Sequence, residues 1–243
     1  MNPEQIFIGI FITILGLLFG SFATMLSYRL PLGQDIVFKR SYCPKCNHNL
    51  SFLDLFPVFS WIFFAGKCHY CKVKIPLRYP LIELSTAGIF LSAYMIFGFN
   101  YMALLIATIG FFLLVISIID FEHYIIPDSL QIILLILAII YAYLQDFAVV
   151  PVLIRVFAVV TFIILLSLSF KFIRKKEGLG FGDVKFFAIA AIFLSFKPFI
   201  LFMFLSGVFG TLIGLIWKYI GKGEIFPFAP ALCGALYICL VVA

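Results

Sequence analysis

The sequence predicts an all-α polytopic membrane protein with about eight transmembrane helices and one small loop domain outside the bilayer. Composition is the first reason: 65% of the 243 residues are hydrophobic and 12% are charged, with a mean hydropathy of +1.21. A soluble domain carries about 25% charged and about 45–50% apolar residues. A soluble enzyme is therefore excluded, as is a disordered or fibrous chain. The other two reasons are the long runs without charge and the distribution of the basic residues between them.

The charge-free runs mark the expected spans. The first, residues 5–28, is long enough for a hydrocarbon core that needs about 20 residues. No basic residue precedes it and no small-residue cleavage site follows, so we expect it to be retained rather than removed as a signal peptide. The other expected spans are 79–98, 101–119, 129–145, 149–170, 183–196, 198–217 and 226–243. The predicted organisation is a first helix at 1–28, a loop region at 29–78 and a seven-helix region at 79–243.

The basic residues predict the orientation. If the N-terminus lies outside, 15 of the 17 Lys and Arg fall in cytoplasmic stretches, as the positive-inside rule requires, and only Arg155 and Lys197 lie outside. The cytoplasmic bases are Arg29, Lys39, Arg40, Lys45, Lys67, Lys72, Lys74 and Arg78; Lys171, Arg174, Lys175, Lys176 and Lys185; and Lys218 and Lys222. The net charge of +6 therefore reflects membrane topology and is no argument for a nucleic-acid partner.

Two G-x-x-x-G patterns, Gly16 to Gly20 and Gly210 to Gly214, lie inside expected spans. Small residues at this spacing let helix backbones approach closely. Packing within one bundle is the preferred interpretation, and homodimerisation is the alternative.

The loop at 29–78 carries two C-x2-C pairs separated by 21 residues, which is one residue beyond the usual spacing of a four-cysteine zinc site. Cys43, Cys46, Cys68 and Cys71 are the expected ligands of a structural Zn²⁺ that stabilises a region too small for a large apolar core. Two disulfides are the alternative, but the expected cytoplasmic location disfavours them. His48 and His69 are expected at the surface, and Cys233 and Cys239 are expected to be buried in the last span.

The positions of the 11 acidic residues are informative because there are so few. Four lie at the expected cytoplasmic membrane boundary, where ionisable groups are candidates for function: Asp120, Glu122, Asp128 and Asp183. Plain structural roles are open for three of them. Asp128, with Gln131 three residues on, has the pattern of a helix N-cap. Glu122 fits a solvated loop, and Asp183, after Gly180-Phe181-Gly182, fits a cap.

Asp120 and Asp183 suggest a specific chemistry. A pair of carboxyl groups from different spans can share one proton, so that one member deprotonates water while the other polarises a carbonyl. Such a pair hydrolyses a peptide with no metal and no covalent intermediate. Gly180 and Gly182 permit backbone conformations closed to other residues and let a substrate chain pass close by. The motifs of serine hydrolases and of zincin metalloproteases are missing from the sequence.

The chain resembles the type IV prepilin peptidases, the GxGD-type membrane aspartyl proteases. The resemblance covers nearly the whole chain and rests on several motifs in family order. These are Gly20-Ser21-Phe22 with Tyr28-Arg29-Leu30-Pro31, Ser41-Tyr42-Cys43-Pro44-Lys45-Cys46, Phe56-Pro57-Val58-Phe59-Ser60-Trp61, Gly66-Lys67-Cys68, Arg78-Tyr79-Pro80-Leu81-Ile82-Glu83, Asp120 with Ile126-Pro127-Asp128, Gly180-Phe181-Gly182-Asp183-Val184-Lys185 and Phe226-Pro227-Phe228-Ala229-Pro230.

The resemblance implies that Asp120 and Asp183 are the catalytic pair, with Gly180, Gly182, Lys185, Glu122 and Asp128 supporting them. It implies cleavage of the short basic leader of prepilins or pseudopilins at the cytoplasmic face of the bacterial inner membrane. It further implies methylation of the new N-terminus with S-adenosylmethionine, to which the zinc-binding cysteine region is linked in the family. Position 122 is Glu where many relatives have Asp. Glu83 also matches the family pattern, and either an ion pair with Arg78 or a role in methyl transfer is open for it.

Two other functions fit parts of the sequence. A proton-coupled transporter could use Asp120 and Asp183 as a relay, although no inverted repeat is evident. A zinc-stabilised membrane scaffold would have no chemistry. The sequence does not identify the pathway, which could be pilus assembly, type II secretion or DNA uptake.

Overall fold

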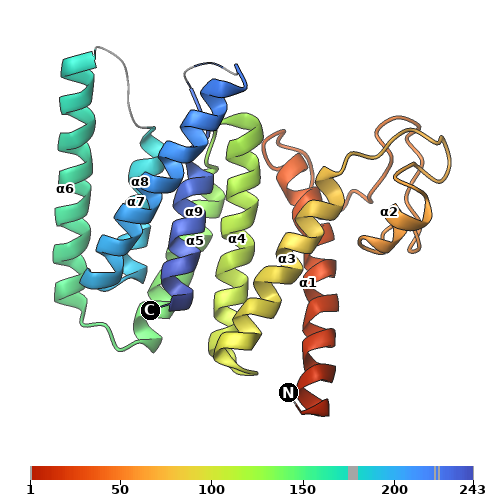
Figure 1. Ribbon diagram of the computed structural model, residues 1–243, viewed down its shortest axis with the longest axis horizontal. Helices are drawn as coiled ribbons and strands as arrows, with labels where there is room; N and C mark the ends of the chain where they lie inside the picture. The colour runs from red at the N-terminus through yellow and green to blue at the C-terminus, as the bar shows by residue number, and fades with distance from the viewer. Residues whose placement is uncertain (1, 175–179, 222, 224, 243) are drawn as a thin grey trace. The chain divides into compact units, whose positions relative to one another are not determined.

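The computed structural model describes residues 2–174, 180–221, 223 and 225–242. Their regular structure is helical, and the pairing of extended backbone among them is limited to two isolated bridges, Tyr42 with Asn49 and Lys67 with Lys74. The helices are α1 (Pro3–Arg29), α2 (Phe59–Phe63), α3 (Arg78–Phe97), α4 (Tyr101–His123), α5 (Asp128–Leu144), α6 (Val149–Arg174), α7 (Phe181–Phe193), α8 (Phe196–Tyr219) and α9 (Ala229–Val242) (Figure 1). The expected all-α class is confirmed.

Eight of these helices are apolar, and they lie at the eight segments that the sequence predicted. Five of them, α1, α3, α4, α6 and α8, are long and apolar enough to cross a membrane. Helices α5, α7 and α9 have 17, 13 and 14 residues. At about 1.5 Å per residue they are shorter than a hydrocarbon core of about 30 Å. The chain is thus a multi-pass membrane protein, and the count of eight complete spans stays a prediction.

The chain divides into two compact units, residues 1–111 and 112–243, and the division falls within α4. The first unit contains α1, α2, α3, the start of α4 and the four-cysteine region. The second contains the rest of α4 and helices α5 to α9. Each unit is described by itself below.

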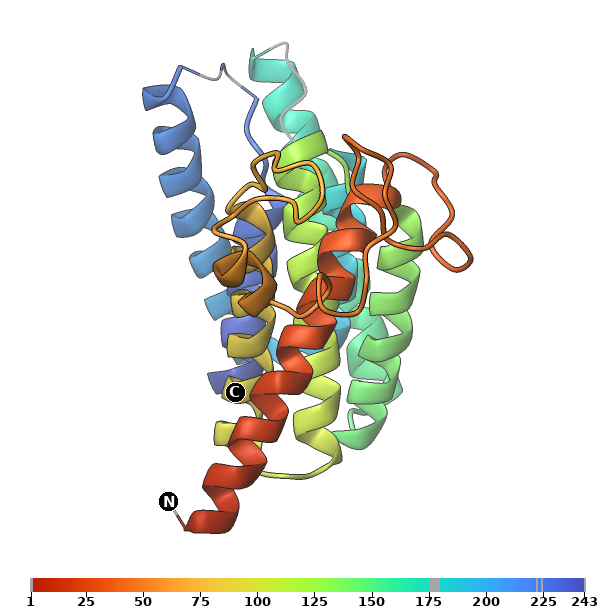
Figure 2. The ribbon, with the colours of Figure 1, turned by 90° about the vertical axis from the view of Figure 1, so that its right-hand side faces the viewer.

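In the first unit, α1 and α3 pack along one another (Figure 2). Two glycines of α1 make this close approach possible. A Cβ on Gly16 would lie 2.7 Å from Cα of Ala87, and a Cβ on Gly20 would lie 2.5 Å from Cα of Glu83. The first G-x-x-x-G pattern therefore serves packing within the chain, as preferred from the sequence.

The cysteine region leaves α1 at Arg29, whose side chain is only 4% exposed. Its guanidinium donates hydrogen bonds to three backbone carbonyls, those of Asp35 at 3.0 Å, Lys39 at 2.7 Å and Arg40 at 3.0 Å. The cationic end of α1 thus fixes the path of the chain toward the cysteines.

In the second unit, α7 contacts α5, α6 and α9, while α8 packs against α9. The second G-x-x-x-G pattern accommodates rings from the segment before α9: a Cβ on Gly210 would lie 2.5 Å from the Phe228 ring, and one on Gly214 would lie 3.4 Å from the Phe226 ring. Arg155 of α6 donates a 2.6 Å hydrogen bond to the Ala191 carbonyl in the last turn of α7.

Two helix ends differ from the approximate limits of the expected spans for local reasons. The last helix begins at Ala229 rather than at residue 226, because residues 226–228 run without helical structure against α8 and Pro230 favours a position in the first turn of a helix. Helix α7 ends at Phe193 rather than at 196, because Leu194 is extended and Ser195 is the N-cap residue of α8.

Candidate active site and metal centre

Asp120 lies in the last turn of α4 and is 6% exposed. Its Oδ2 accepts a 2.8 Å hydrogen bond from the backbone N–H of Ala229, the first residue of α9. The first N–H groups of a helix have no partner within the helix and favour a negative charge. Asp120 therefore joins α4 to the start of α9, and the Phe226–Pro230 segment supplies the donor.

Asp183 lies in the first turn of α7 and is half-buried. Its Oδ2 accepts a hydrogen bond from the backbone N–H of Gly180, the N-cap residue, at 3.2 Å. The capping role that the sequence left open is thus present in the structure. It occupies one carboxylate oxygen and does not conflict with a chemical role for the other.

The two carboxyl groups come from helices far apart in the sequence, and Asp183 lies within the electrostatic reach of Asp120. The buried thiol of Cys233 in α9 also lies within the electrostatic reach of both. Two carboxyl groups in a poorly solvated site cannot both ionise without a large cost, so they can hold one proton between them. This arrangement can deprotonate a water molecule and protonate a carbonyl oxygen at the same time.

The glycines before Asp183 do not use the unusual backbone conformations that glycine permits. Gly180 has φ −70° and ψ 148°, and neither Gly180 nor Gly182 is among the residues with positive φ. The absence of a side chain at each glycine instead leaves space for a neighbouring side chain. A Cβ on Gly182 would lie 3.3 Å from Cβ of Ile126, and a Cβ on Gly180 would lie 3.3 Å from Oδ2 of Asp183.

The expected N-cap at Asp128 is also wrong. Asp128 is the first helical residue of α5, behind Pro127, and makes no capping hydrogen bond. Its Oδ1 instead pairs with Nζ of Lys185 at 2.7 Å, with side-chain exposures of 70% and 38% for the aspartate and the lysine. The pair links the start of α5 to the first turns of α7, although such exposed pairs contribute little stability.

Gln131 was expected to complete a capping box, but it serves the Asp183 turn. It is 4% exposed, and its Nε2 donates a 3.2 Å hydrogen bond to the Gly182 carbonyl. Its Oε1 is buried without a hydrogen-bond partner. The sequence signal for this contact is the polar Gln131 on an otherwise apolar helix, which the local pattern ascribes to capping. Glu122, by contrast, is exposed in the last turn of α4.

In the first unit, the four sulfur atoms of Cys43, Cys46, Cys68 and Cys71 lie within 4.8 Å of one another. The Cys43 and Cys71 sulfurs are 3.9 Å apart. Four thiolates about 2.3 Å from a tetrahedral Zn²⁺ lie about 3.8 Å apart, so the four residues fit this ion. All six cysteines are free of disulfides within the described part of the chain, and Cys233 and Cys239 are buried as expected.

The backbone around the cysteines favours a thiolate. Burial raises the pKa of Cys43, but hydrogen bonds from the N–H groups of Cys46 and Lys45 and from neighbouring thiols outweigh burial. The pKa of Cys43 is therefore lowered from the ordinary 9.0 to about 7. The pKa of Cys71 is about 11, because the Val73 N–H lowers it less than desolvation and the other thiols raise it. Several thiolates at this spacing repel one another, and a cation bound among the sulfur atoms would offset that repulsion. His69 lies outside the sulfur cluster and faces Asp54, at 3.4 Å from Nδ1 to Oδ1.

Glu83 lies in α3 and is 7% exposed. Its Oε2 accepts a 2.7 Å hydrogen bond from the backbone N–H of Val58. Arg78, its proposed partner, donates from NH2 to the Ser27 hydroxyl at 2.9 Å. The contact of Glu83 with Val58 could not be predicted from sequence spacing.

Two family models match the chain and divide it near the start of α4. The model of the bacterial peptidase A24 N-terminal domain matches residues 14–97, and that of the type IV leader peptidase family matches residues 107–215. A prepilin leader peptidase/N-methyltransferase of Stutzerimonas stutzeri is 32% identical, over 94% of this chain and 88% of the relative. The chain belongs to the type IV leader peptidase family.

Other family members give the same result. The prepilin leader peptidase/N-methyltransferase of Pseudomonas aeruginosa is 33% identical, over 94% of this chain and 88% of its own length. The prepilin leader peptidase/N-methyltransferase of Myxococcus xanthus is 30% identical, over 85% of this chain and 62% of its own length. No solved structure matches the chain. In the family models, the four cysteines and Glu83 fall in the N-terminal domain, and Asp120 and Asp183 fall in the peptidase domain.

Proposed function

We propose that this protein is a membrane aspartyl endopeptidase that removes the leader from type IV prepilins or pseudopilins and methylates the new N-terminus. The observation that carries the peptidase proposal is that Asp183 of α7 lies within the electrostatic reach of Asp120 of α4, inside the region matched by the leader peptidase family. Membership of this family, whose members above are named as peptidases and methyltransferases, favours it over the proton-coupled transporter.

The mechanism requires only the two carboxyl groups and water. The ionised carboxylate takes a proton from water, whose oxygen attacks the scissile carbonyl carbon, while the protonated carboxyl donates its proton to the carbonyl oxygen. Collapse of the tetrahedral intermediate breaks the C–N bond, and the leaving nitrogen takes up the proton that water released. The N–H groups of Ala229 and Gly180 each hold one carboxylate oxygen and orient the other.

The four cysteines are proposed to hold a structural Zn²⁺. Four thiolates complete a tetrahedral shell and leave no open position for catalysis. The methyl donor is proposed to be S-adenosylmethionine, from the methyltransferase activity named in the relatives. Glu83 is nearly enclosed and engaged by Val58, so we assign it no contact with this donor.

The proposed setting is the bacterial inner membrane, with the N-terminus outside and Asp120 and Asp183 near the cytoplasmic face. The distribution of Lys and Arg supports this orientation. It places the acids on the side from which a cytoplasmic leader would be presented. The division into a first helix at 1–28, a cytoplasmic cysteine region at 29–78 and a peptidase region at 79–243 is part of the same proposal.

The test is cleavage of a prepilin by the purified protein, followed as loss of the leader on a gel. Asp120→Asn and Asp183→Asn keep the size of each side chain but remove its acid–base function, so each should slow cleavage at least about 100-fold. Asp146→Asn is the matched control, because Asp146 is an exposed acid at the α5–α6 connection. Cleavage at the unmodified rate by either of the first two variants would show that the pair is not catalytic.

A further inference from the structure

The segment between the two cysteine pairs is more apolar than a loop in water should be. Between Lys45 and Lys67 it has no Lys or Arg, and its one acid, Asp54, has a side chain that is 6% exposed. The large apolar side chains of this segment are instead exposed: Phe52 78%, Leu53 74%, Ile62 61% and Phe63 82%. The sequence placed all of 29–78 outside the bilayer, and this exposure pattern is unexpected there.

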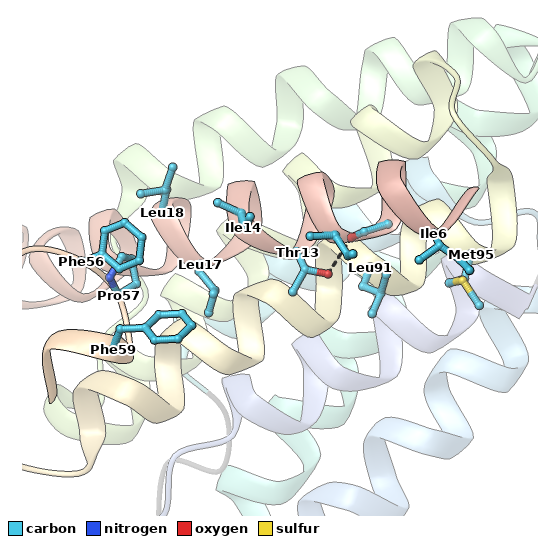
Figure 3. A pocket seen from close by; sticks show the side chains of 12 residues that line it. Ile6, Thr13, Ile14, Leu17, Leu18, Phe56, Pro57, Phe59, Leu91 and Met95 are labelled. Carbon is cyan, nitrogen blue, oxygen red and sulfur yellow. Dashed lines mark hydrogen bonds between the residues drawn. The ribbon is translucent and has the colours of Figure 1, made fainter. Parts of the chain in front are cut away.

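The position of the segment relative to α1 and α3 explains the pattern. Helix α2 lies beside the upper halves of α1 and α3 rather than beyond their ends, at the same height in both views (Figures 1 and 2). Phe56, Pro57 and Phe59 lie next to Leu17 and Leu18 of α1 (Figure 3). They line an apolar groove of about 720 Å³ along the two helices.

The depth of the segment follows from its contact with α3. This helix has 20 residues, about 30 Å, which is the thickness of the hydrocarbon core, so Arg78 at its start marks one edge. Glu83 lies five residues further along, about 7–8 Å inside that edge. Since Val58 donates to Glu83, the turn at Val58 lies at about the same depth.

Irregular backbone at this depth requires that its polar groups be satisfied by the protein. The structure meets this requirement for the N–H groups of the turn around Val58. From residue 55 to 60, the N–H groups of Leu55, Phe56, Phe59 and Ser60 donate to carbonyls within the segment, and Pro57 has no N–H. Val58, which has a positive φ of 61°, donates instead to the carboxylate of Glu83 at 2.7 Å.

We propose that the segment Phe52–Phe63 dips into the lipid bilayer beside α1 and α3, with acyl chains in the apolar groove and Glu83 as the acceptor of the Val58 N–H at its turn. The flanking Lys45 and Lys67 then lie where phospholipid headgroups can neutralise them. The cysteine region is thereby anchored to the membrane at a third point, in addition to α1 and α3. Glu83 is a positioning residue of this anchor.

Photo-crosslinking in lipid nanodiscs tests the immersion. The photoreactive residue p-benzoylphenylalanine, which inserts into C–H bonds, replaces Phe63 or Phe52 in the full chain. After irradiation without substrate, mass spectrometry should find one phospholipid added through an acyl chain. The same residue in place of Lys45, an exposed position in the first cysteine pair, should give no acyl adduct.

Three outcomes would overturn the proposal: no lipid adduct at positions 52 and 63, crosslinks from these positions to other parts of this chain instead of lipid, or an adduct that forms only with added prepilin. The last would identify a substrate-docking surface rather than a lipid anchor.

The role of Glu83 is tested with two variants in the background that carries the crosslinker at position 63. Glu83→Gln keeps an acceptor for the Val58 N–H and should retain most of the acyl adduct. Glu83→Leu removes the acceptor and should reduce the adduct several-fold. Equal yields from both variants would contradict the assignment of Glu83, while the crosslinks in the unmodified background decide the immersion independently.

Discussion

The backbone N–H of Ala229 donates to Oδ2 of Asp120 across 109 positions of sequence, at 2.8 Å and in a buried environment. This bond makes the start of α9 a part of the candidate active site. Because the Pro-containing segment before α9 is not helical, α9 begins at Ala229, the residue whose N–H Asp120 accepts. The orientation of Asp120 therefore depends on a backbone donor that no side-chain motif reveals.

Replacing Ala229 by Pro should slow prepilin cleavage about 10-fold or more, with the fold retained. Proline is tolerated in the first turn of a helix, but it removes the N–H that Asp120 accepts, and a lost partner of a buried charged group costs about 1–3 kcal/mol. Cleavage rate and thermal unfolding are the measurements. Ala229→Gly keeps the donor and should retain most activity; equal rates for the two variants would show that the bond is dispensable.

Replacing Gly182 by Ala should reduce cleavage several-fold. The added Cβ would lie 3.3 Å from Cβ of Ile126, which is attached to the backbone and cannot move away by a rotamer change, so the turn that carries Asp183 must shift. Gly207→Ala is the matched control, because nothing lies within 4 Å of a Cβ there. It should be neutral or stabilise α8 by up to about 1 kcal/mol. Full activity of Gly182→Ala would argue against tight packing of this turn.

Replacing Cys43 or Cys68 by Ser should lower the zinc content of the purified protein from about one ion per chain toward zero, because each removes a thiolate from a four-ligand site. Elemental analysis gives the stoichiometry. Cys239→Ser, at a buried cysteine outside the cluster, should leave it unchanged. Retention of the ion by the Cys43 and Cys68 variants would place the metal elsewhere.

The cysteine region should lose stability in acid partly through Asp54. Burial raises the pKa of this carboxyl, but hydrogen bonds from the Ser51 hydroxyl and N–H and from Tyr70 outweigh burial, and the pKa lies below the ordinary 3.8. A lowered pKa means that the unfolded chain binds more protons. The contribution of Asp54 is therefore complete above about pH 5 and is lost as the pH falls through the pKa of the folded state.

This contribution can be isolated by urea unfolding of the metal-depleted protein between pH 6 and pH 3, followed by tryptophan fluorescence. Asp54→Asn should unfold more easily at pH 6 and show a weaker dependence on pH than the unmodified protein. Asp146→Asn should keep the original dependence. Identical pH profiles for the unmodified protein and Asp54→Asn would show that Asp54 does not contribute to the loss of stability in acid.

Features that are set by short stretches of chain could be predicted from the sequence. The eight apolar helices and the four cysteines could be predicted because hydropathy and ligand spacing are properties of short stretches of chain. The cap at Asp128 was predicted wrongly by the same local reasoning. In the structure Asp128 pairs with Lys185, and Gly182 and Gly180 provide space for Ile126 and Asp183. These contacts come from other helices, so no local pattern contains them.

The sequence by itself determined the membrane class and the helices, and it singled out Asp120 and Asp183 as candidates, because charge is so scarce in this chain that each acid stands out. Tertiary structure alone decided what those groups contact: Ala229 with Asp120, Gln131 with the Gly182 carbonyl, and Val58 with Glu83. The physical reason is that a buried polar group must find its partner wherever the packing of helices brings one. That partner is often a backbone carbonyl, which every residue type presents alike, or a backbone N–H, which every type except proline presents.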